Sequence, residues 1–456
     1  MAKPTPCELL YHVVGDYWKS EQKERSLTTF KSIAGVPWKS LTPDNRANWL
    51  VPEHASEFAE FLPIGSKQAK ATKEENIEAI FHLFSGGVKT NRDDVVYQFD
   101  RRQLKQQVQD FIEEYNAEVD RFKRTDYKGD IFSFLRFDRI KWSETLIANV
   151  AKGKGAVFNE SSLRICLYRP FQKEWLYFNE MLVERRYLFP LFFPTAETEN
   201  VLIWLKVGSS WPMFALAANG IVDLLPVTGS QCFPFYVYDE DGSNRRENIT
   251  DWALTQFRRH YGDDSIGKWD IFHYVYGLLH HPGYRGKFAD NLKRELPRLP
   301  FAPSPPTPLP LSTGGEGSSG FRAFASAGAD LARLHLDYEK LEPYPLTWLE
   351  TPGVPLSYRI EDKMRLSKDK TTLIVNPSLT LSGIPPETFA YRLGNRSALE
   401  WVIDQYQVSE DKRSGIRSDP NRANDPEYIV RLVGQVVRVS VETVRIVAGL
   451  PSKFSP

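Results

Sequence analysis

Basic and aromatic side chains alternate along residues 164–187. The segment begins RICLYRPFQKEWLYFN, and ERRY follows from residue 184. Arginine and lysine can bind phosphates or the edge of guanine, and asparagine and glutamine can pair with adenine. Residues 121–190 carry 14 Lys or Arg against 8 Asp or Glu, in a chain whose formal net charge is +0. This local excess indicates contact with a polyanion; the alternative is a core of rings beneath a solvated charged face.

Two further loops concentrate hydrogen-bonding side chains. They are KTNRDD at residues 89–94 and YRLGNRS at residues 391–397, which directly precedes a helical pattern. Asn395 can cap that helix, which leaves Arg396 in the first turn, where the helix dipole disfavours a cation. A phosphate or base edge would compensate this cation, and pairing with Glu400 is the alternative. The candidate nucleic-acid-binding side chains of all three segments are Asn91, Arg92, Arg169, Lys173, Arg185, Arg186, Arg392, Asn395 and Arg396.

Signatures of catalysis are absent from the sequence: GxxxxGK[ST], GxGxxG, GxSxG and HExxH do not occur. Residues 376–379, Asn-Pro-Ser-Leu, are similar to the Asn/Asp-Pro-Pro-aromatic tetrapeptide of amino-methyltransferases, but the second proline and the aromatic ring are missing. A turn at the end of a strand is therefore favoured there. His260, His273, His280 and His281 lie among apolar residues, which favours packed helices over a metal site.

Composition narrows the class of protein. The chain has 456 residues, 41% hydrophobic, 25% charged and 13% aromatic, which excludes collagen-like, wholly disordered and coiled-coil proteins. Cys7, Cys166 and Cys232 are too few and too far apart for a disulfide framework. The N-terminal residues lack the apolar core of a signal peptide, and no apolar stretch is long enough to span a bilayer. We therefore expect a cytoplasmic protein.

Helices and strands must position the candidate residues. The clearest pattern steps by three and four from Leu104 to Phe122 and predicts an amphipathic helix over residues 102–124. Further helices are predicted from Asn248 or Thr250 to Tyr261, from Lys268 to His281, around Phe288–Leu296, around Phe321–Tyr338 and from Asn395 to Tyr406. Buried strands are predicted at residues 201–207, 234–239 and 371–376, and two or three antiparallel strands at residues 428–450. Residues 300–320, rich in Pro, Gly and Ser, predict a linker or surface insertion.

Several long phrases resemble one known family. They are FSGGVKTNRDDVVYQF (84–99), LYRPFQKEWLYFNE (167–180), ERRYLFP (184–190), FRAFASAGADLARLHLDYE (321–339) and NPSLTLSGIPPETFAYRLGNRSALEWVIDQYQV (376–408). The chain is similar to the C-terminal specificity domain, or target recognition domain, of type ISP restriction–modification enzymes. These single-polypeptide enzymes of bacterial defence join a nuclease, a translocating ATPase, an adenine-N6 methyltransferase and a target recognition domain. The KTNRDD loop is similar to the TG-x-[DN] loop of adenine methyltransferases, with Asn91 where glycine is usual.

The resemblance implies a mixed α+β, two-lobed target recognition domain with antiparallel strands and a helical block. We expect residues 1–130 to be a connector with a long helix that follows a missing methyltransferase, and residues 131–300 to be a central recognition lobe. Residues 301–320 would be the insertion, and residues 321–456 a C-terminal lobe. The implied function is sequence-specific recognition of double-stranded DNA, by a truncated or split polypeptide without catalysis of its own.

The implied partners are double-stranded DNA and a methyltransferase–helicase–nuclease chain, without a membrane. No cofactor is expected in this chain, since S-adenosylmethionine, ATP and Mg²⁺ belong to the missing domains. Two alternatives stay open. One is an adenine-specific DNA methyltransferase with unrecognised motifs, and the other is a protein-interaction module without a DNA role, which zero net charge and many rings would suit.

Overall fold

The computed structural model describes residues 7–455, apart from residues 17, 45–46, 68–76, 126, 139, 209–210, 225–229 and 304–318. Within these residues the fold is mixed α+β, as the sequence predicts. Most of the predicted insertion lies outside the described residues. No helix in the described part of the chain is long and apolar enough to cross a membrane.

A three-stranded antiparallel sheet, in the order β10-β7-β8, forms the central layer. Its strands are β7 (Leu202–Lys206), β8 (Phe214–Ala218) and β10 (Ser230–Pro234). Every residue of β7 is buried, because successive side chains enter two different cores. Leu202 and Trp204 join one apolar cluster, and Ile203 and Leu205 join the other. The uninterrupted apolar run that predicted this strand therefore reflects burial on both faces.

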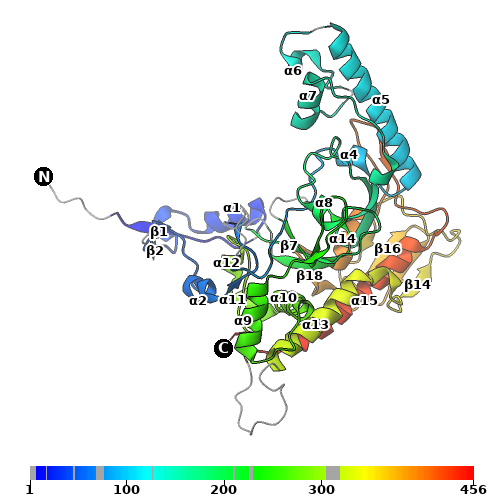
Figure 1. Ribbon diagram of the computed structural model, residues 1–456. Helices are drawn as coiled ribbons and strands as arrows, with labels where there is room; N and C mark the ends of the chain where they lie inside the picture. The colour runs from blue at the N-terminus through cyan, green and yellow to red at the C-terminus, as the bar shows by residue number, and fades with distance from the viewer. Residues whose placement is uncertain are drawn as a thin grey trace.

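Three long helices pack together in the lower part of the molecule in Figure 1: α10 (Lys268–His280), α13 (Ser319–Leu336) and α15 (Tyr428–Ala448). α10 and α13 both contact β8 and each other. Gly277 and Gly328 lie at their crossing, where a Cβ on Gly328 would stand 1.8 Å from the carbonyl oxygen of His273. The two backbones thus approach more closely than any larger residue permits.

A second, four-stranded sheet in the order β4-β6-β5-β9 carries the basic–aromatic segment. Its strands are β4 (Tyr97–Gln98), β5 (Leu163–Arg169), β6 (Gln172–Tyr177) and β9 (Ile221–Val222). β5 and β6 form an antiparallel hairpin, and β9 runs parallel to β5. Most residues of the hairpin are buried or half-buried, so the rings of this segment are largely core.

The C-terminal part adds a sheet in the order β14-β17-β16-β15, which lies to the right in Figure 1. Its strands are β14 (Thr347–Glu350), β15 (Arg365–Leu366), β16 (Thr372–Asn376) and β17 (Leu379–Ser382). The two-residue strands β18 (Arg392–Leu393) and β19 (Arg396–Ser397) lead into α14 (Ala398–Gln405). Trp401 and Val402 of α14 are fully buried, which fixes the hairpin on the body.

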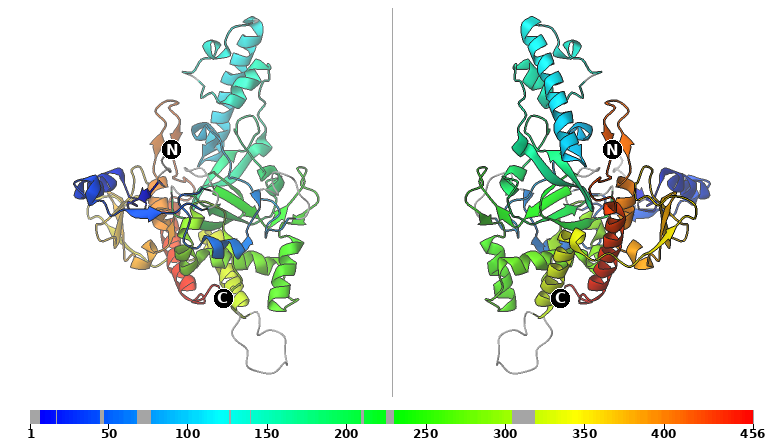
Figure 2. Two further views of the ribbon diagram at one scale, coloured as in Figure 1. Left: turned by 90° about the vertical axis from the view of Figure 1, so that its left-hand side faces the viewer. Right: turned by 90° about the vertical axis from the view of Figure 1, so that its right-hand side faces the viewer.

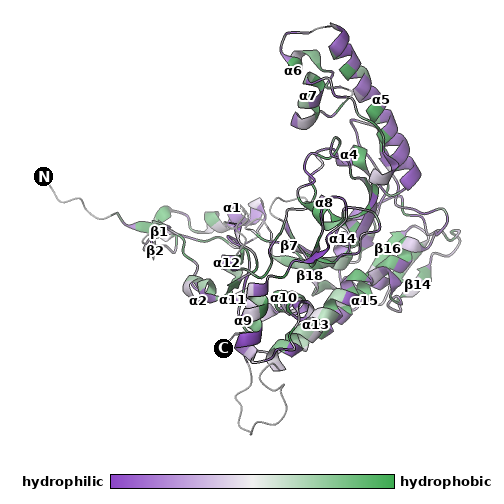
Figure 3. Ribbon diagram, in the orientation of Figure 1, coloured by the Kyte–Doolittle hydropathy of each residue, from purple (hydrophilic) through white to green (hydrophobic). Residues whose placement is uncertain are grey.

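Two parts extend away from the body (Figures 1 and 2). One is a projection of α5 (Arg101–Thr125), α6 (Ile131–Phe134) and α7 (Glu144–Ala151). The outer side of α5 is hydrophilic along its length (Figure 3). The other is the N-terminal part, with β1 (Leu9–Tyr11), α1 (Ser20–Thr29), β2 (Lys39–Leu41) and α2 (Ala55–Glu60).

The remaining helices and strands are short connections, apart from α9. They are β3 (Leu62–Pro63), α4 (Asp93–Val96), α8 (Phe189–Phe192), β11 (Tyr236–Val237), β12 (Arg246–Glu247), α9 (Asp251–Tyr261), α11 (Pro282–Lys287), α12 (Ala289–Leu292), β13 (Arg298–Leu299), β20 (Ser409–Glu410) and β21 (Arg417–Ser418). The sequence correctly predicts α5, α9, α10, α13, β7 and β16. Of the helix predicted around Phe288–Leu296, only the four residues of α12 are helical, and α11 ends before this range.

The strands predicted at residues 428–450 are wrong, because this segment is the single helix α15. Its valines and isoleucines alternate with polar residues, which mimics the period of a strand. The same residues also recur at helical spacing, and α15 buries them against α13 and α14. The strand preference of β-branched residues is weak, so this packing decides the structure.

Candidate nucleic-acid interface

Two candidate segments that are far apart in sequence lie side by side. Lys89 and Arg185 form an antiparallel bridge in which each backbone N–H donates to the other's carbonyl oxygen, at 2.9 and 2.8 Å. Val88 next to it pairs with the end of β9 through its N–H and the carbonyl oxygen of Val222. The KTNRDD loop and the ERRY segment therefore form one surface at the end of the β4-β6-β5-β9 sheet.

The tips of both segments have strained backbones. Asn91 has a φ of 60° and Tyr187 a φ of 48°, and both side chains are exposed. Asparagine tolerates this left-handed region, but tyrosine rarely adopts it. Strain of this kind persists only where the surrounding structure enforces it, and it concentrates at ligand-binding loops. The geometry thus presents an amide from one segment and a ring from the other to solvent, on opposite sides of the Lys89–Arg185 bridge.

We call Lys89, Asn91, Lys141, Arg185 and Tyr187 the recognition surface. Lys89, Asn91 and Lys141 line one shallow hollow together with Arg169. Lys141 lies 3.4 Å from Asp94, and the side chain of Arg185 stays about half exposed. Lysine, arginine, asparagine and tyrosine are the side chains that donate to phosphates and base edges, so this surface suits a nucleic acid.

Arg92 does not reach this surface, although the sequence places it among the candidates. Its side chain is fully buried, and its guanidinium donates to the carbonyl oxygen of Leu182 and to Ser143 Oγ. Burial lowers the pKa of Arg92 to about 10, while Glu184 and Asp94 oppose the shift. Arg92 therefore has a structural role: its buried hydrogen bonds hold the loop that carries Asn91 in place.

Arg169 is the centre of a buried charged cluster beneath the hollow. It pairs with Asp223 at 2.9 Å, lies 4.0 Å from Asp93, and stacks on Tyr168 at 3.7 Å. Glu174 on β6 belongs to the same cluster, and burial raises its pKa to about 8. Gln172 donates to this carboxyl group. One arginine thus shares its charge among several acids, which keeps Arg169 in place.

Glu174 gives the fold a pH dependence that can be measured. Its pKa is higher in the folded than in the unfolded chain, so this group's contribution to stability is complete below about pH 4.5 and declines as pH rises through about 8. Glu174→Gln is expected to remove that decline and to raise the free energy of unfolding at pH 9 by about 1–3 kcal/mol. Denaturant unfolding of both proteins at pH 6 and pH 9 measures this change in the free energy of unfolding. Parallel pH profiles for both proteins would contradict the prediction.

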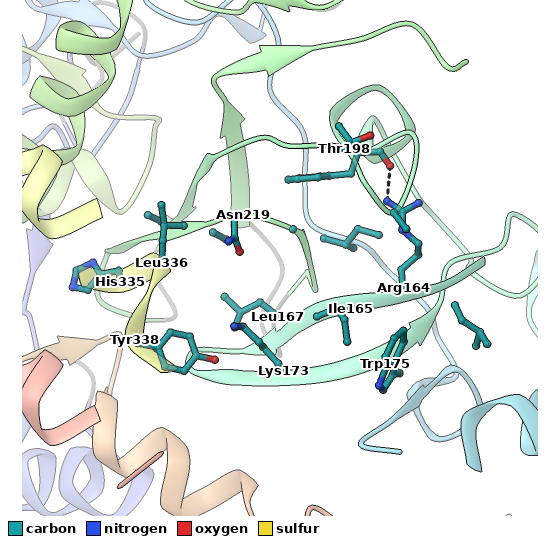
Figure 4. Close-up of a pocket in the computed structure, with 17 residues that line it drawn as sticks. Arg164, Ile165, Leu167, Lys173, Trp175, Thr198, Asn219, His335, Leu336 and Tyr338 are labelled. Atoms are coloured by element: carbon teal, nitrogen blue, oxygen red, sulfur yellow. Dashed lines mark hydrogen bonds between the residues drawn. The ribbon is translucent and has the colours of Figure 1, made fainter. Parts of the chain in front are cut away.

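Lys173 and Arg186 each form an ion pair with an acidic side chain. Lys173 forms an ion pair with Glu339, and its amine lies 4.9 Å from the ring of Tyr338. It lines a cleft of about 320 Å³ beside the hairpin (Figure 4), opposite Asn219 and with Trp175 at one end. Arg186 lies 3.2 Å from Glu180. Both are held within the fold, so their DNA contacts stay predictions.

Arg392, Asn395 and Arg396 belong to a separate hairpin, β18–β19, which lies directly before α14 in the chain. Gly394 makes its turn with a φ of 71°, against Trp211, and Arg392 donates to the carbonyl oxygen of Asn395. The N-cap of α14 is Ser397 rather than the predicted Asn395, and Glu400 completes the capping box. A hydroxyl directly before the helix satisfies the free N–H groups, which leaves Asn395 exposed in the turn.

Arg396 pairs with Asp404 at 3.0 Å and lies over the ring of Trp401 at 4.9 Å, instead of pairing with Glu400. We expect Arg396→Ala to lower the free energy of unfolding by about 1 kcal/mol, the combined size of an exposed ion pair and a cation–π contact. If its outer edge also reads guanine, DNA affinity falls by about 1–3 kcal/mol and specificity relaxes at one base pair. Thermal unfolding and binding at fixed salt separate the two roles. An unchanged affinity would make Arg396 purely structural.

The alternative catalytic and metal-binding features are structural. The side chain of Asn376 accepts from the N–H groups of Ser378 and Leu379 and donates to two carbonyl oxygens, which closes the turn after β16. His280 is buried with a pKa lowered to about 3 by burial, and His281 caps α11. Among the described residues, no group of His, Cys, Asp and Glu could hold a metal ion.

Sequence reasoning missed Lys89, Lys141 and Tyr187. Lys89 and Tyr187 belong to segments that it selected, and their exposure follows from the strained turns. Lys141 carries no local signal, because only the return of the chain from α6 to α7 brings it to the hollow. A packed scaffold that carries exposed polar loops is the arrangement of a recognition domain.

The model of the type ISP C-terminal specificity domain matches residues 79–432, and the chain belongs to this family. Three solved structures are similar over nearly the whole chain. A nuclease-deletion mutant of the type ISP restriction–modification enzyme LlaGI, in complex with a DNA substrate mimic, is 28% identical with a TM-score of 0.81 over 98% of this chain. The DrdV–DNA complex is 35% identical with a TM-score of 0.80 over 98% of this chain.

The third is the ATP-dependent type ISP enzyme LlaBIII bound to DNA, which is 25% identical with a TM-score of 0.81 over 100% of this chain. The chain spans only 33%, 43% and 28% of the lengths of the LlaGI, DrdV and LlaBIII chains. No curated protein matches.

Proposed function

We propose that this chain is the DNA-specificity module of a type ISP restriction–modification system. The observation that carries the proposal is the match to the family's specificity domain, together with the likeness to three enzymes solved with DNA. Asn91 would read a base edge in the major groove, while Lys89 and Arg185 would bind the flanking phosphates. Tyr187 would pack on the sugar or a base.

We further propose that the chemistry is done by a methyltransferase–helicase–nuclease polypeptide, which would use S-adenosylmethionine, ATP and Mg²⁺ in the cytoplasm. This chain would need no cofactor. The N-terminal part supports such a partner, since no described residue before Phe58 is buried. Its exposed apolar side chains are Leu10, Val13, Trp18, Leu27, Ile33, Trp38, Trp49 and Val51. A segment without a core of its own is expected to pack against another protein surface.

Selection from a random duplex library tests the proposal, because a specificity module must enrich one sequence. The double variant Lys89→Gln/Arg185→Gln should weaken binding to all duplexes and reduce the slope of log affinity against log salt by about 1.8, or about 0.9 per phosphate contact. Arg333→Gln/Lys340→Gln removes the same charge from exposed positions elsewhere and should leave binding unchanged. Equal binding of all sequences by the wild-type chain would overturn the proposal.

A further inference from the structure

The projection of α5, α6 and α7 carries most of the positive charge that the sequence concentrates in residues 121–190. Residues 121–154 contain nine Lys or Arg and four Asp or Glu, whereas the preceding residues 101–120 of α5 contain three and five. In Figures 1 and 2 the outer part of this segment extends away from the body, and the end of α5 lies farthest from it. The structure thus separates this charge from the β5–β6 hairpin, whose Arg169 and Lys173 are paired with acids.

Part of this charge has no counter-charge among the described residues. Lys123, Arg124, Lys152 and Lys154 are exposed and form no ion pair with a described residue. Within the described part of the chain, Arg124 donates a hydrogen bond to the carbonyl oxygen of Asp120, one turn earlier in α5. Because four cations at one end of an elongated element repel each other, their gathering there is best explained by an anionic ligand.

The end of the projection is rigid enough to hold these cations in place. Phe122, Tyr127 and Phe134 pack as a cluster of rings, with centroids 4.9–6.5 Å apart, and join α6 to α5. Glu118 lies within 2.5 Å of Arg121 and 3.7 Å of Arg136. Tyr115 and Asn116 hydrogen-bond to the backbone of Lys154 and Ala156, which fixes the segment after α7.

The projection also leads directly to the recognition surface. The chain returns from α6 through Lys141, which lines the hollow with Lys89 and Asn91. Ser143, the N-cap of α7, accepts from the buried guanidinium of Arg92. The base of the projection and the loop that carries Asn91 are therefore one connected unit, and a ligand on one is well placed to contact the other.

We propose that the end of the projection, defined by Lys123, Arg124, Lys152 and Lys154, is a second DNA-binding site that grips the phosphate backbone without reading sequence. This inference rests on the proposed function and assigns a separate role within it. The eight residues of α7 lead from Ser143, which contacts Arg92, to Lys152 and span about 12 Å. The site would thus contact phosphates about four base pairs from the bases that the recognition surface reads, at about 3.4 Å per base pair.

The test uses the full chain and the variant Lys123→Gln/Arg124→Gln/Lys152→Gln. Affinity is measured against salt for the selected duplex and for a scrambled duplex of equal length. We expect both slopes to fall by about 2–3, since each lost phosphate contact removes about 0.9, while the ratio of the two affinities stays constant. Arg333→Gln/Lys340→Gln/Arg445→Gln is the matched control, because it removes three exposed charges elsewhere.

A second measurement uses duplex length. The wild-type chain should gain affinity when the duplex is extended by about half a helical turn on one side of the selected site, and the triple variant should lose this gain. Wild-type slopes in the triple variant, or an altered ratio between the two duplexes, would overturn the inference while leaving the proposed function intact. Wild-type slopes with weakened capture of a protein partner would assign the projection to that partner. Equal binding of all duplexes by the wild-type chain would instead overturn the proposed function.

Discussion

Replacing Arg92 by alanine is expected to lower the free energy of unfolding by about 3–5 kcal/mol. The change removes the hydrogen bonds to Leu182 and Ser143 and one of two cations near the buried Glu184, which leaves Arg185 at 3.8 Å as the other. One oxygen of Glu184 already lacks a partner in the described structure, so the interior has little means to compensate. Denaturant unfolding of the full chain measures the loss.

Arg185→Ala is the matched control for Arg92. The two arginines lie in neighbouring segments, but the side chain of Arg185 is about half exposed. Its replacement should lower the free energy of unfolding by no more than about 1 kcal/mol, the size of a partly exposed ion pair such as the one it forms with Glu184 at 3.8 Å. The two variants could instead have the same free energy of unfolding, with only the DNA affinity of Arg92→Ala reduced. In that case Arg92 contacts DNA, and our assignment of a structural role to it is wrong.

The second large effect is expected at the crossing of α10 and α13. Gly328→Ala would place a Cβ 1.8 Å from the carbonyl oxygen of His273 and 2.9 Å from the backbone nitrogen of Gly277. Both obstacles are backbone atoms, so the helices must move apart and lose contacts along their length. Overpacking usually costs about 1–3 kcal/mol, and we expect about 3 kcal/mol or more here, because a helix must shift rather than a side chain.

Gly286→Ala provides the comparison for Gly328. Gly286 lies in α11, is exposed, and has no atom within 4 Å of the added Cβ. Alanine favours a helix by about 0.5–1 kcal/mol over glycine, so this variant should be neutral or more stable. Thermal unfolding measures the melting temperatures of both variants, and that of Gly328→Ala should be the lower. Equal melting temperatures would mean that the two helices do not meet as closely as the geometry requires.

Several elements follow from local sequence alone. The three-and-four spacing from Leu104 to Phe122 determines α5, because an apolar stripe of that period has only one face to bury. Thr250 begins α9 as predicted, since its hydroxyl accepts from the N–H of Ala253. The phrases that resemble type ISP enzymes also sufficed for the family, because they extend over most of the chain.

Other features depend on contacts that no local pattern records. The apolar residues of α15 fit a strand and a helix equally well, and only the surfaces of α13 and α14 select the helix. Asn395 and Ser397 are both good caps, and the position where α14 begins decides in favour of Ser397.

The candidate interface was likewise predictable from the sequence only in part. Residue type identified segments rich in Arg, Lys and Asn, because those side chains are the ones that bind phosphates and bases. It could not distinguish the buried Arg92 from its exposed neighbour Asn91, since burial depends on Leu182 and Ser143, which are distant in sequence. Nor could it join Lys89 to Arg185, because that bridge closes only when the sheet forms. Sequence determined which chemistry the chain carries, and tertiary structure decided which of those side chains face solvent together.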